Sequence, residues 1–138
     1  MEIVGRVLDN WKDIWCSKSA GYVGTGDGSM ADLLGLDGFD SGIGYISPEN
    51  WSEYVRQTCE TIGLAADDAF LEVGCGTGAF MHALIPTPKK QVGVDFSASQ
   101  IKVAEKFKSE QMTFLETEAN NNHTLEGKFD VVLVNSVI

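Results

Sequence analysis

The apolar positions in the first half of the chain follow the spacing of amphipathic helices. In residues 1–15 they recur every three or four positions, which predicts one helix. Ser47, followed by proline, is typical of a helix start and Gly63 of a helix end, so a second helix is predicted between them. Eight of the fifteen glycines lie in residues 21–44, around a predicted short helix at 30–34. This half is expected to be two helices joined by a mobile, glycine-rich loop.

In the second half, short runs of consecutive apolar residues alternate with helical segments. Strands are predicted at 69–73, 91–95, 112–116 and 129–134. A helix is predicted at 79–85, and another after Ser97, which would form a capping box with Gln100. Strands that alternate with helices and lack a polar face indicate a parallel sheet covered on both sides. The expected fold class is α/β, a doubly wound, Rossmann-like parallel sheet of about four strands.

The chain is expected to have an N-terminal helical cap with the glycine-rich loop, residues 1–66, and an α/β core, residues 67–138. Its 138 residues, 43% hydrophobic, suffice for a buried core and exclude disorder, collagen and a disulfide scaffold. The net charge is −10, and residues 1–68 hold 12 acidic and 4 basic side chains. Such acidity argues against a nucleic-acid partner, because phosphate contacts need clustered Lys and Arg.

Cysteine usage and hydropathy indicate a compartment. The three cysteines are odd in number and match no metal-ligand spacing, so we expect buried thiols in a reducing environment and no metal site. No apolar run approaches the roughly 20 residues of a membrane span, and the charged N-terminus is unlike a secretory signal. A cytoplasmic protein with no membrane partner is therefore expected.

Residues 71–78, with the sequence LEVGCGTG, join a strand to a helix through three glycines. The glycines permit a tight turn and let a ligand lie against the backbone, and the helix start supplies free N–H groups. Asp95 ends the next strand 21 residues after Gly74, where it can bind ribose hydroxyls. An adenosine cofactor is expected. A dinucleotide pattern is also satisfied by Gly74, Gly76 and Ala79, although the third glycine and the acid before the first one weigh against it.

An acid followed by x-G-x-G-x-G resembles the first motif of the class I S-adenosylmethionine-dependent methyltransferases. This resemblance covers residues 69–138 and implies S-adenosylmethionine as cofactor, with S-adenosylhomocysteine as product. Glu72 would organise the methionine end, Asp95 the ribose, Phe96 and Glu118 the adenine, and Asn135 would face the methyl donor or the acceptor. The implied cofactor-binding set is Glu72, Gly74, Cys75, Gly76, Gly78, Asp95, Phe96, Glu118, Ala119 and Asn135.

Structural roles remain open for several of these side chains. Glu72 could cap a neighbouring helix, Asp95 could be an ordinary strand-end carboxylate, and Glu118 could belong to a solvated loop. His82 is expected to be a surface or packing residue rather than a general base. No catalytic residue is assigned, because methyl transfer depends mainly on aligning donor and acceptor.

The resemblance implies a methyltransferase that acts on a small molecule. The acids around the glycine-rich loop, Asp27, Asp32, Asp37 and Asp40, suggest an acceptor with an amine. In the family the sheet begins in the order 3-2-1-4 and continues beyond the fourth strand. This sequence stops soon after its fourth strand, so we expect either a truncated chain or self-association, as a homodimer through that exposed edge or by exchanged segments. The alternative function is a catalytically incomplete fragment that binds cofactor or oligomerises.

Overall fold

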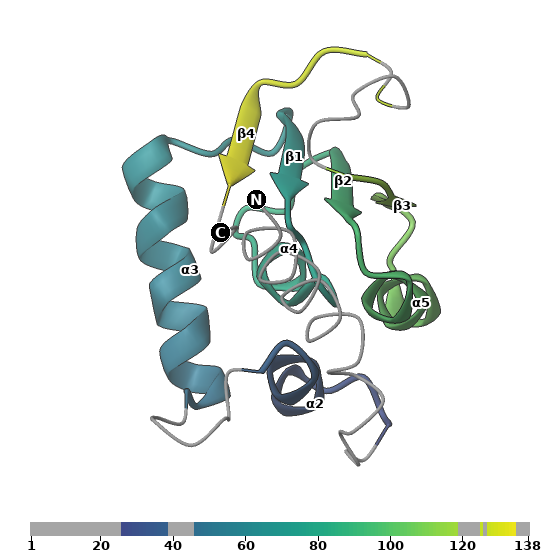
Figure 1. The fold of residues 1–138 in the computed structure, drawn as a ribbon. Coiled ribbons are helices and arrows are strands. Elements are labelled where there is room, and N and C mark those ends of the chain that lie inside the picture. Colours follow the sequence, from purple (N-terminus) through teal and green to yellow (C-terminus); the bar gives the residue numbers. More distant parts are fainter. Residues whose placement is uncertain (1–25, 39–45, 119–124, 126, 135–138) are drawn as a thin grey trace, which may run out of the picture.

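The computed structural model describes residues 26–38, 46–118, 125 and 127–134, in which a four-stranded parallel sheet is flanked by helices (Figure 1). The strands are β1 (Ala69–Val73), β2 (Lys90–Asp95), β3 (Met112–Glu116) and β4 (Val131–Val134), in the order β3-β2-β1-β4. The described helices are α2 (Met30–Leu36), α3 (Pro48–Ile62), α4 (Ala79–His82) and α5 (Ala98–Phe107). The predicted Rossmann-like α/β fold is confirmed. The helix expected at 1–15 lies outside the described residues.

Helix α3 begins and ends where the sequence predicts. The Ser47 hydroxyl accepts a hydrogen bond from the Asn50 backbone N–H at 3.1 Å, and Pro48 occupies the first turn. Gly63 ends the helix with a φ of 68°, a left-handed conformation that glycine adopts without strain. The face with Trp51 is buried in the core.

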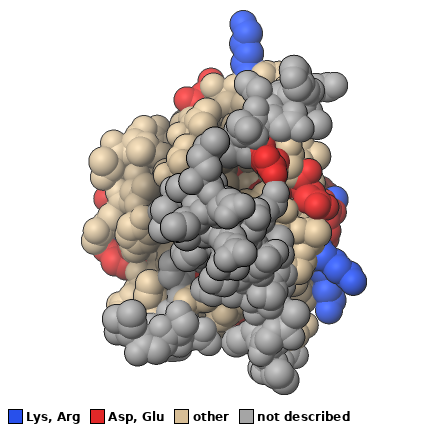
Figure 2. All heavy atoms as spheres, in the orientation of Figure 1, with Lys and Arg blue, Asp and Glu red and all other residues tan. Residues whose placement is uncertain are grey.

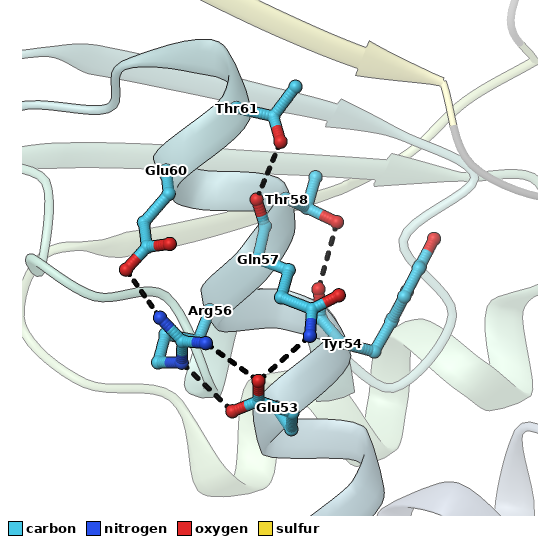
Figure 3. A network of polar contacts seen from close by, with 7 residues as sticks. All are labelled: Glu53, Tyr54, Arg56, Gln57, Thr58, Glu60 and Thr61. Atoms are coloured by element: carbon cyan, nitrogen blue, oxygen red, sulfur yellow. Dashed lines mark hydrogen bonds and ion pairs between the residues drawn. The ribbon is translucent and has the colours of Figure 1, made fainter.

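The outer face of α3 carries a network of exposed polar side chains (Figure 3). Arg56 bonds to Glu53 at 2.6 Å and also to Glu60. The Arg56 hydrogen bond, followed by that of Gln57, lowers the pKa of Glu53 to about 2. Because these groups are solvated and belong to one helix, they mark its outer surface rather than a site.

Several element boundaries differ from the prediction. Helix α4 ends at His82 rather than 85, because Ala83 N–H and Leu84 N–H bond three residues back and tighten the last turn. Helix α2 extends two residues beyond 34. Strand β4 begins at Val131 rather than 129.

The predicted capping box at α5 forms only in part. The Ser97 hydroxyl accepts from Gln100 N–H at 3.4 Å, as expected. The Gln100 side chain does not return to Ser97; its Nε2 donates to the Leu36 carbonyl of α2 at 3.0 Å. Ser97 N–H bonds instead to Asp95. The Gln100 side chain therefore joins α5 to α2.

The strand register separates the sheet into two faces. One face carries Phe70, Glu72, Gln91, Gly93, Met112, Phe114, Val131 and Leu133. All four described helices contribute to the core on this face, which we call the helix-covered face. On the opposite face a smaller cluster of Leu71, Val92 and Val94 is packed against by Leu125 and Phe129. Cover by helices is thus seen on one face of the described part.

The carboxyl ends of the strands meet at one end of the sheet, next to α2 (Figure 1). The β1–α4 loop, the tip of β2 and the segment after β3 all lie there, and Thr117 N–H donates to the Asp95 carbonyl at 2.9 Å. Helix α2 contacts α4 beside this edge. In the view of Figure 2, Lys and Arg lie at separate places on the rim of the described part. None of the described helices is long and apolar enough to cross a membrane.

Candidate cofactor-binding site

The glycine loop after β1 is tied to the end of β2. Gly74 N–H and Cys75 N–H both donate to the Val94 carbonyl, at 2.8 and 3.1 Å. Gly78 has a φ of 84°, and a Cβ there would lie 2.8 Å from the Phe114 ring. Glycine is therefore required at this position by both conformation and space. The loop is fixed at the carboxyl edge of the sheet, as the motif predicts.

Asp95 reaches the glycine loop from the tip of β2. Its Oδ2 accepts from Gly76 N–H and its Oδ1 from Ser97 N–H, each at 2.9 Å. A carboxylate has about four lone-pair positions, so two remain for further donors such as hydroxyl groups. Asp95 is therefore more than an ordinary strand-end acid, because it ties the loop to the start of α5.

Glu72 is buried on the helix-covered face beside the loop. Its exposed fraction is 3%, and in the described part of the chain no donor reaches its Oε2. Burial raises the pKa of Glu72 well above its usual value, and the charges of Asp37 and Asp95 raise it further. A capping role is not supported, since no described helix N–H donates to this carboxylate.

Cys75 points beneath the loop toward β2. A Cβ on Gly93 would lie 2.8 Å from the Cys75 sulfur. Burial, with the charges of Glu72, Asp95 and Asp37, raises the pKa of the thiol well above its usual value. The thiol is therefore a small apolar group, as predicted for the cysteines. Cys59 is also free and buried.

Two residues at the loop escape the sequence prediction. Thr77 donates from its backbone N–H and from its hydroxyl to the two carboxylate oxygens of Asp37, at 2.9 Å each. Asp37 Oδ1 also lies where a Cβ on Gly76 would be. Asp37 follows α2, 40 residues before Thr77. No local pattern could have found this contact, although Asp37 was among the acids expected near a ligand.

The acids of the glycine-rich segment do not form one patch. Asp32 is buried within the first turn of α2, where its Oδ2 accepts from Gly28 N–H. Asp27 accepts from Ser29 N–H in an exposed turn. Among Asp27, Asp32 and Asp37, the described acids of this segment, Asp37 is the one that accepts hydrogen bonds from the loop; Asp40 lies outside the described residues. Asp37 is therefore the acid of this segment that is seen in hydrogen-bond contact with the loop, and the suggestion of an acceptor with an amine stays a prediction.

The other predicted site residues lie around the same edge or outside the described residues. Phe96 is half-buried after β2, and Glu118 is exposed after β3. Ala119 and Asn135 are outside the described residues. His82 is half-buried, and burial lowers its pKa, which agrees with the packing role. In residues 26–38, 46–118, 125 and 127–134, no group of three His, Cys, Asp or Glu side chains is placed to hold a metal ion.

Comparison with known proteins identifies the class. The methyltransferase domain family matches residues 71–138. An S-adenosylmethionine-dependent methyltransferase from Clostridium acetobutylicum is 28% identical with a TM-score of 0.53, over 70% of this chain and 40% of that one. A dimethyladenosine transferase from Plasmodium falciparum is 26% identical with a TM-score of 0.51, over 60% of this chain and 31% of that one. A comparison with curated proteins found no match.

Residues 71–138 therefore belong to the methyltransferase domain family, within the S-adenosylmethionine-dependent class. The predictions of this class, its cofactor and its Rossmann-like fold are confirmed. The chain spans less than half the length of these solved relatives. A coclaurine N-methyltransferase bound to N-methylheliamine and S-adenosylhomocysteine shares the fold at 16% identity, with a TM-score of 0.59 over 89% of this chain and 40% of that one.

The residues present fit this cofactor. Asp95 accepts from Gly76 N–H and keeps acceptor capacity for the ribose, and the Asp37 carboxylate lies against the Cβ-free side of Gly76. The buried Glu72 offers an unpartnered oxygen, and an amino acid ammonium is the kind of donor it lacks.

Proposed function

We propose that this chain binds S-adenosylmethionine over residues 74–78 and transfers its methyl group to a small molecule. The observation that carries the proposal is the Asp95 carboxylate bound to Gly76 N–H at 2.9 Å. That bond brings the acid of the second strand onto a glycine turn that opens a helix, the arrangement suited to a nucleoside. The unpartnered Glu72 oxygen beside it suits the cationic end of the same molecule.

The proposed roles are those that the resemblance to the family implies. Asp95 binds the ribose hydroxyls and Glu72 the methionine end. Phe96 lies beside the adenine, and Glu118 accepts from its amino group. The glycines and the Cys75 backbone line the path of the cofactor, and Ala119 and Asn135 complete the proposed set. The proposed division into a cap, residues 1–66, and a core, residues 67–138, places all of these residues in the core.

Methyl transfer needs alignment more than acid or base catalysis. When bound, the cofactor supplies a methyl group that its sulfonium activates for in-line displacement. The chain orients the cofactor through Asp95 and Glu72 and excludes water with α2, which lies over Thr77. Holding the reacting atoms about 3–3.5 Å apart can contribute several kcal/mol.

Calorimetric titration tests the cofactor assignment. The chain should bind S-adenosylmethionine and S-adenosylhomocysteine but not NAD. Asp95→Ala and Gly76→Val should each lose at least about tenfold in affinity, because one removes charged hydrogen bonds and the other fills the bare face of the loop. Asp68→Ala is the matched control, since Asp68 also accepts a backbone N–H, that of Ala65, at 2.8 Å. Unchanged affinity in both site variants would contradict the proposal.

For the acceptor we propose a neutral or cationic small molecule with an amine. The supporting observation is the imbalance of 12 acidic and 4 basic residues in positions 1–68. The same charge argues against RNA or DNA, whose phosphates it would repel. A methylation assay over amines, thiols and carboxylates tests this part. A preference for anionic acceptors would contradict it.

We also propose self-association through β4. In the described part β4 pairs with β1 and ends the sheet, and its Val132 and Val134 are 58% and 61% exposed. An apolar edge strand is a template for pairing with another strand. The exposed apolar β4 edge supports the alternative function, a cofactor-binding unit that oligomerises. That alternative would be preferred if the chain binds S-adenosylmethionine but does not transfer its methyl group. Sedimentation separates a dimer from a monomer.

A further inference from the structure

The Asp37 carboxylate is seated on the bare side of the glycine loop. Both of its oxygens accept hydrogen bonds from Thr77, and Oδ1 lies where a Gly76 Cβ would be. A ligand that uses the bare face of Gly76 must therefore meet this carboxylate. Residue 37 precedes the family-matched region, so the carboxylate comes to the loop from another part of the chain.

Helix α2 is held in place from two sides, which fixes Asp37. The Thr77 hydroxyl, whose single proton points to Asp37 Oδ2 at 2.9 Å, also lies 3.3 Å from the Leu33 carbonyl, and Gln100 of α5 donates to the Leu36 carbonyl at 3.0 Å. The α2 residues Leu33 and Leu34 are also part of the main core. Asp37 is thus positioned by packed structure rather than by an isolated surface contact.

Glu72 supplies an independent sign of a missing ligand. Its side chain is buried, with Oε2 unpartnered, and it lies within electrostatic reach of both Asp37 and Asp95. Asp95 is engaged with two backbone N–H groups, and Asp37 with Thr77. Of the three carboxylates, Glu72 is the one with a buried oxygen that no described donor reaches, and it requires a proton or a cation, since an unpaired buried charge is costly. The described acids are not placed to chelate a metal ion.

We infer that Asp37 and Glu72 together bind the primary ammonium group of the cofactor, with Asp37 supplied by the end of α2. An ammonium group presents three N–H donors on a compact charge, so it can bond to two carboxylates from different directions. The inference rests on the proposed binding of S-adenosylmethionine. It assigns to α2 a direct part in cofactor binding.

Calorimetry with two ligands tests the inference on the whole chain. S-Adenosylhomocysteine carries the ammonium group, whereas 5′-methylthioadenosine keeps the adenosine but lacks the amino acid. Asp37→Asn should weaken S-adenosylhomocysteine about tenfold, because a charge-assisted hydrogen bond is lost, and change 5′-methylthioadenosine less than about twofold. Asp27→Asn, which removes an equal charge at the opposite end of α2, should leave both affinities unchanged.

The other outcomes overturn the inference. Unchanged or tighter binding of S-adenosylhomocysteine by Asp37→Asn would show that Asp37 does not bind the ammonium group or that it blocks the site. Equal weakening of both ligands would show a structural role alone. If Asp37→Asn fails to fold, Asp37→Ser, which keeps an acceptor for Thr77, should show the same selectivity. If the wild-type chain binds neither ligand, the proposed function itself fails, and the inference with it.

Discussion

Glu72 makes the folded chain sensitive to pH in the direction opposite to that of an ordinary salt-bridged acid. Its pKa is raised by burial and by the charges of Asp37 and Asp95, so above pH 4.5 the folded state keeps a proton that the unfolded state releases. The free energy of unfolding should therefore fall as pH rises from 4.5 through the raised pKa. Each unit of raised pKa corresponds to about 1.4 kcal/mol.

Glu72→Gln should remove this loss. Urea unfolding between pH 4.5 and 8 should show the variant gaining stability relative to wild type as pH rises, because the amide cannot ionise. The control is Glu53→Gln, since the Glu53 pKa of about 2 lies below this range. A constant difference between Glu72→Gln and wild type across the range would show that Glu72 does not titrate there.

Two glycines with left-handed backbones, Gly76 in the loop and Gly63 at the end of α3, distinguish the cost of backbone strain from the loss of space for a ligand. Gly76 and Gly63 both have left-handed φ values, 54° and 68°, but a Cβ meets Asp37 only at Gly76, while Gly63 has nothing within 4 Å. Gly63→Ala should cost about 1–2 kcal/mol of stability from strain, and Gly76→Ala should cost more, because its Cβ must also displace the Asp37 carboxylate. Only Gly76→Ala should also weaken S-adenosylhomocysteine in a titration. Equal ligand affinities in the two variants would contradict the placement of the cofactor over Gly76.

The predictable part of the site is the part encoded locally. Glu72, the loop glycines and Asp95 belong to one strand–turn–helix–strand unit, so their spacing alone brings them to the same edge of the sheet. Asp37 meets Thr77 across 40 residues, and that contact depends on how α2 packs. A single sequence carries no pattern for such a contact.

Among the elements, helix starts were easier to predict than strand starts and short-helix ends. Ser47 and Ser97 act as N-caps through local hydrogen bonds, which the sequence states directly. The start of β4 depends instead on a distant partner, because Ala69 N–H bonds to the Asp130 side chain at 2.8 Å. The Gln100 side chain likewise donates to the Leu36 carbonyl of α2, a distant acceptor, and not to a group in its own helix start as the capping box predicts.

Helix α3 holds the helix that follows the glycine loop. Trp51 Nε1 donates to the Ala79 carbonyl at 3.1 Å, and its ring lies edge-on to Phe80 with centroids 6.0 Å apart. Trp51→Phe keeps an aromatic ring but leaves a buried carbonyl without its donor, so stability in urea should fall by about 1–3 kcal/mol. Tyr54→Phe, at a side chain 47% exposed, should change stability by less than about 0.5 kcal/mol. Similar losses in both variants would show that the indole bond is not what anchors α4.

At the scale of the whole sheet, the described helices cover one face, and β4 and β3 form the two edges of the described part. The described helices share one core with the helix-covered face, while Val132 and Val134 of β4 are exposed on the opposite face. Local patterns predicted four parallel strands, but which edge is left uncovered depends on the order β3-β2-β1-β4. That edge is where the proposed association acts.

Val132→Lys tests whether β4 joins two copies. In the proposed dimer the two edges pair across a two-fold axis, so each copy would bring an unneutralised lysine to the shared interface and destabilise it. Sedimentation should show twice the mass of the chain for wild type and a single mass for the variant, with S-adenosylhomocysteine affinity unchanged. Ile62→Lys, at an apolar side chain 40% exposed on α3, should remain dimeric. A wild-type chain that sediments as a monomer at high concentration would end the self-association proposal. It would leave the cofactor site untouched, because Glu72 lies on β1, Gly76 on the loop between β1 and α4, and Asp95 on β2.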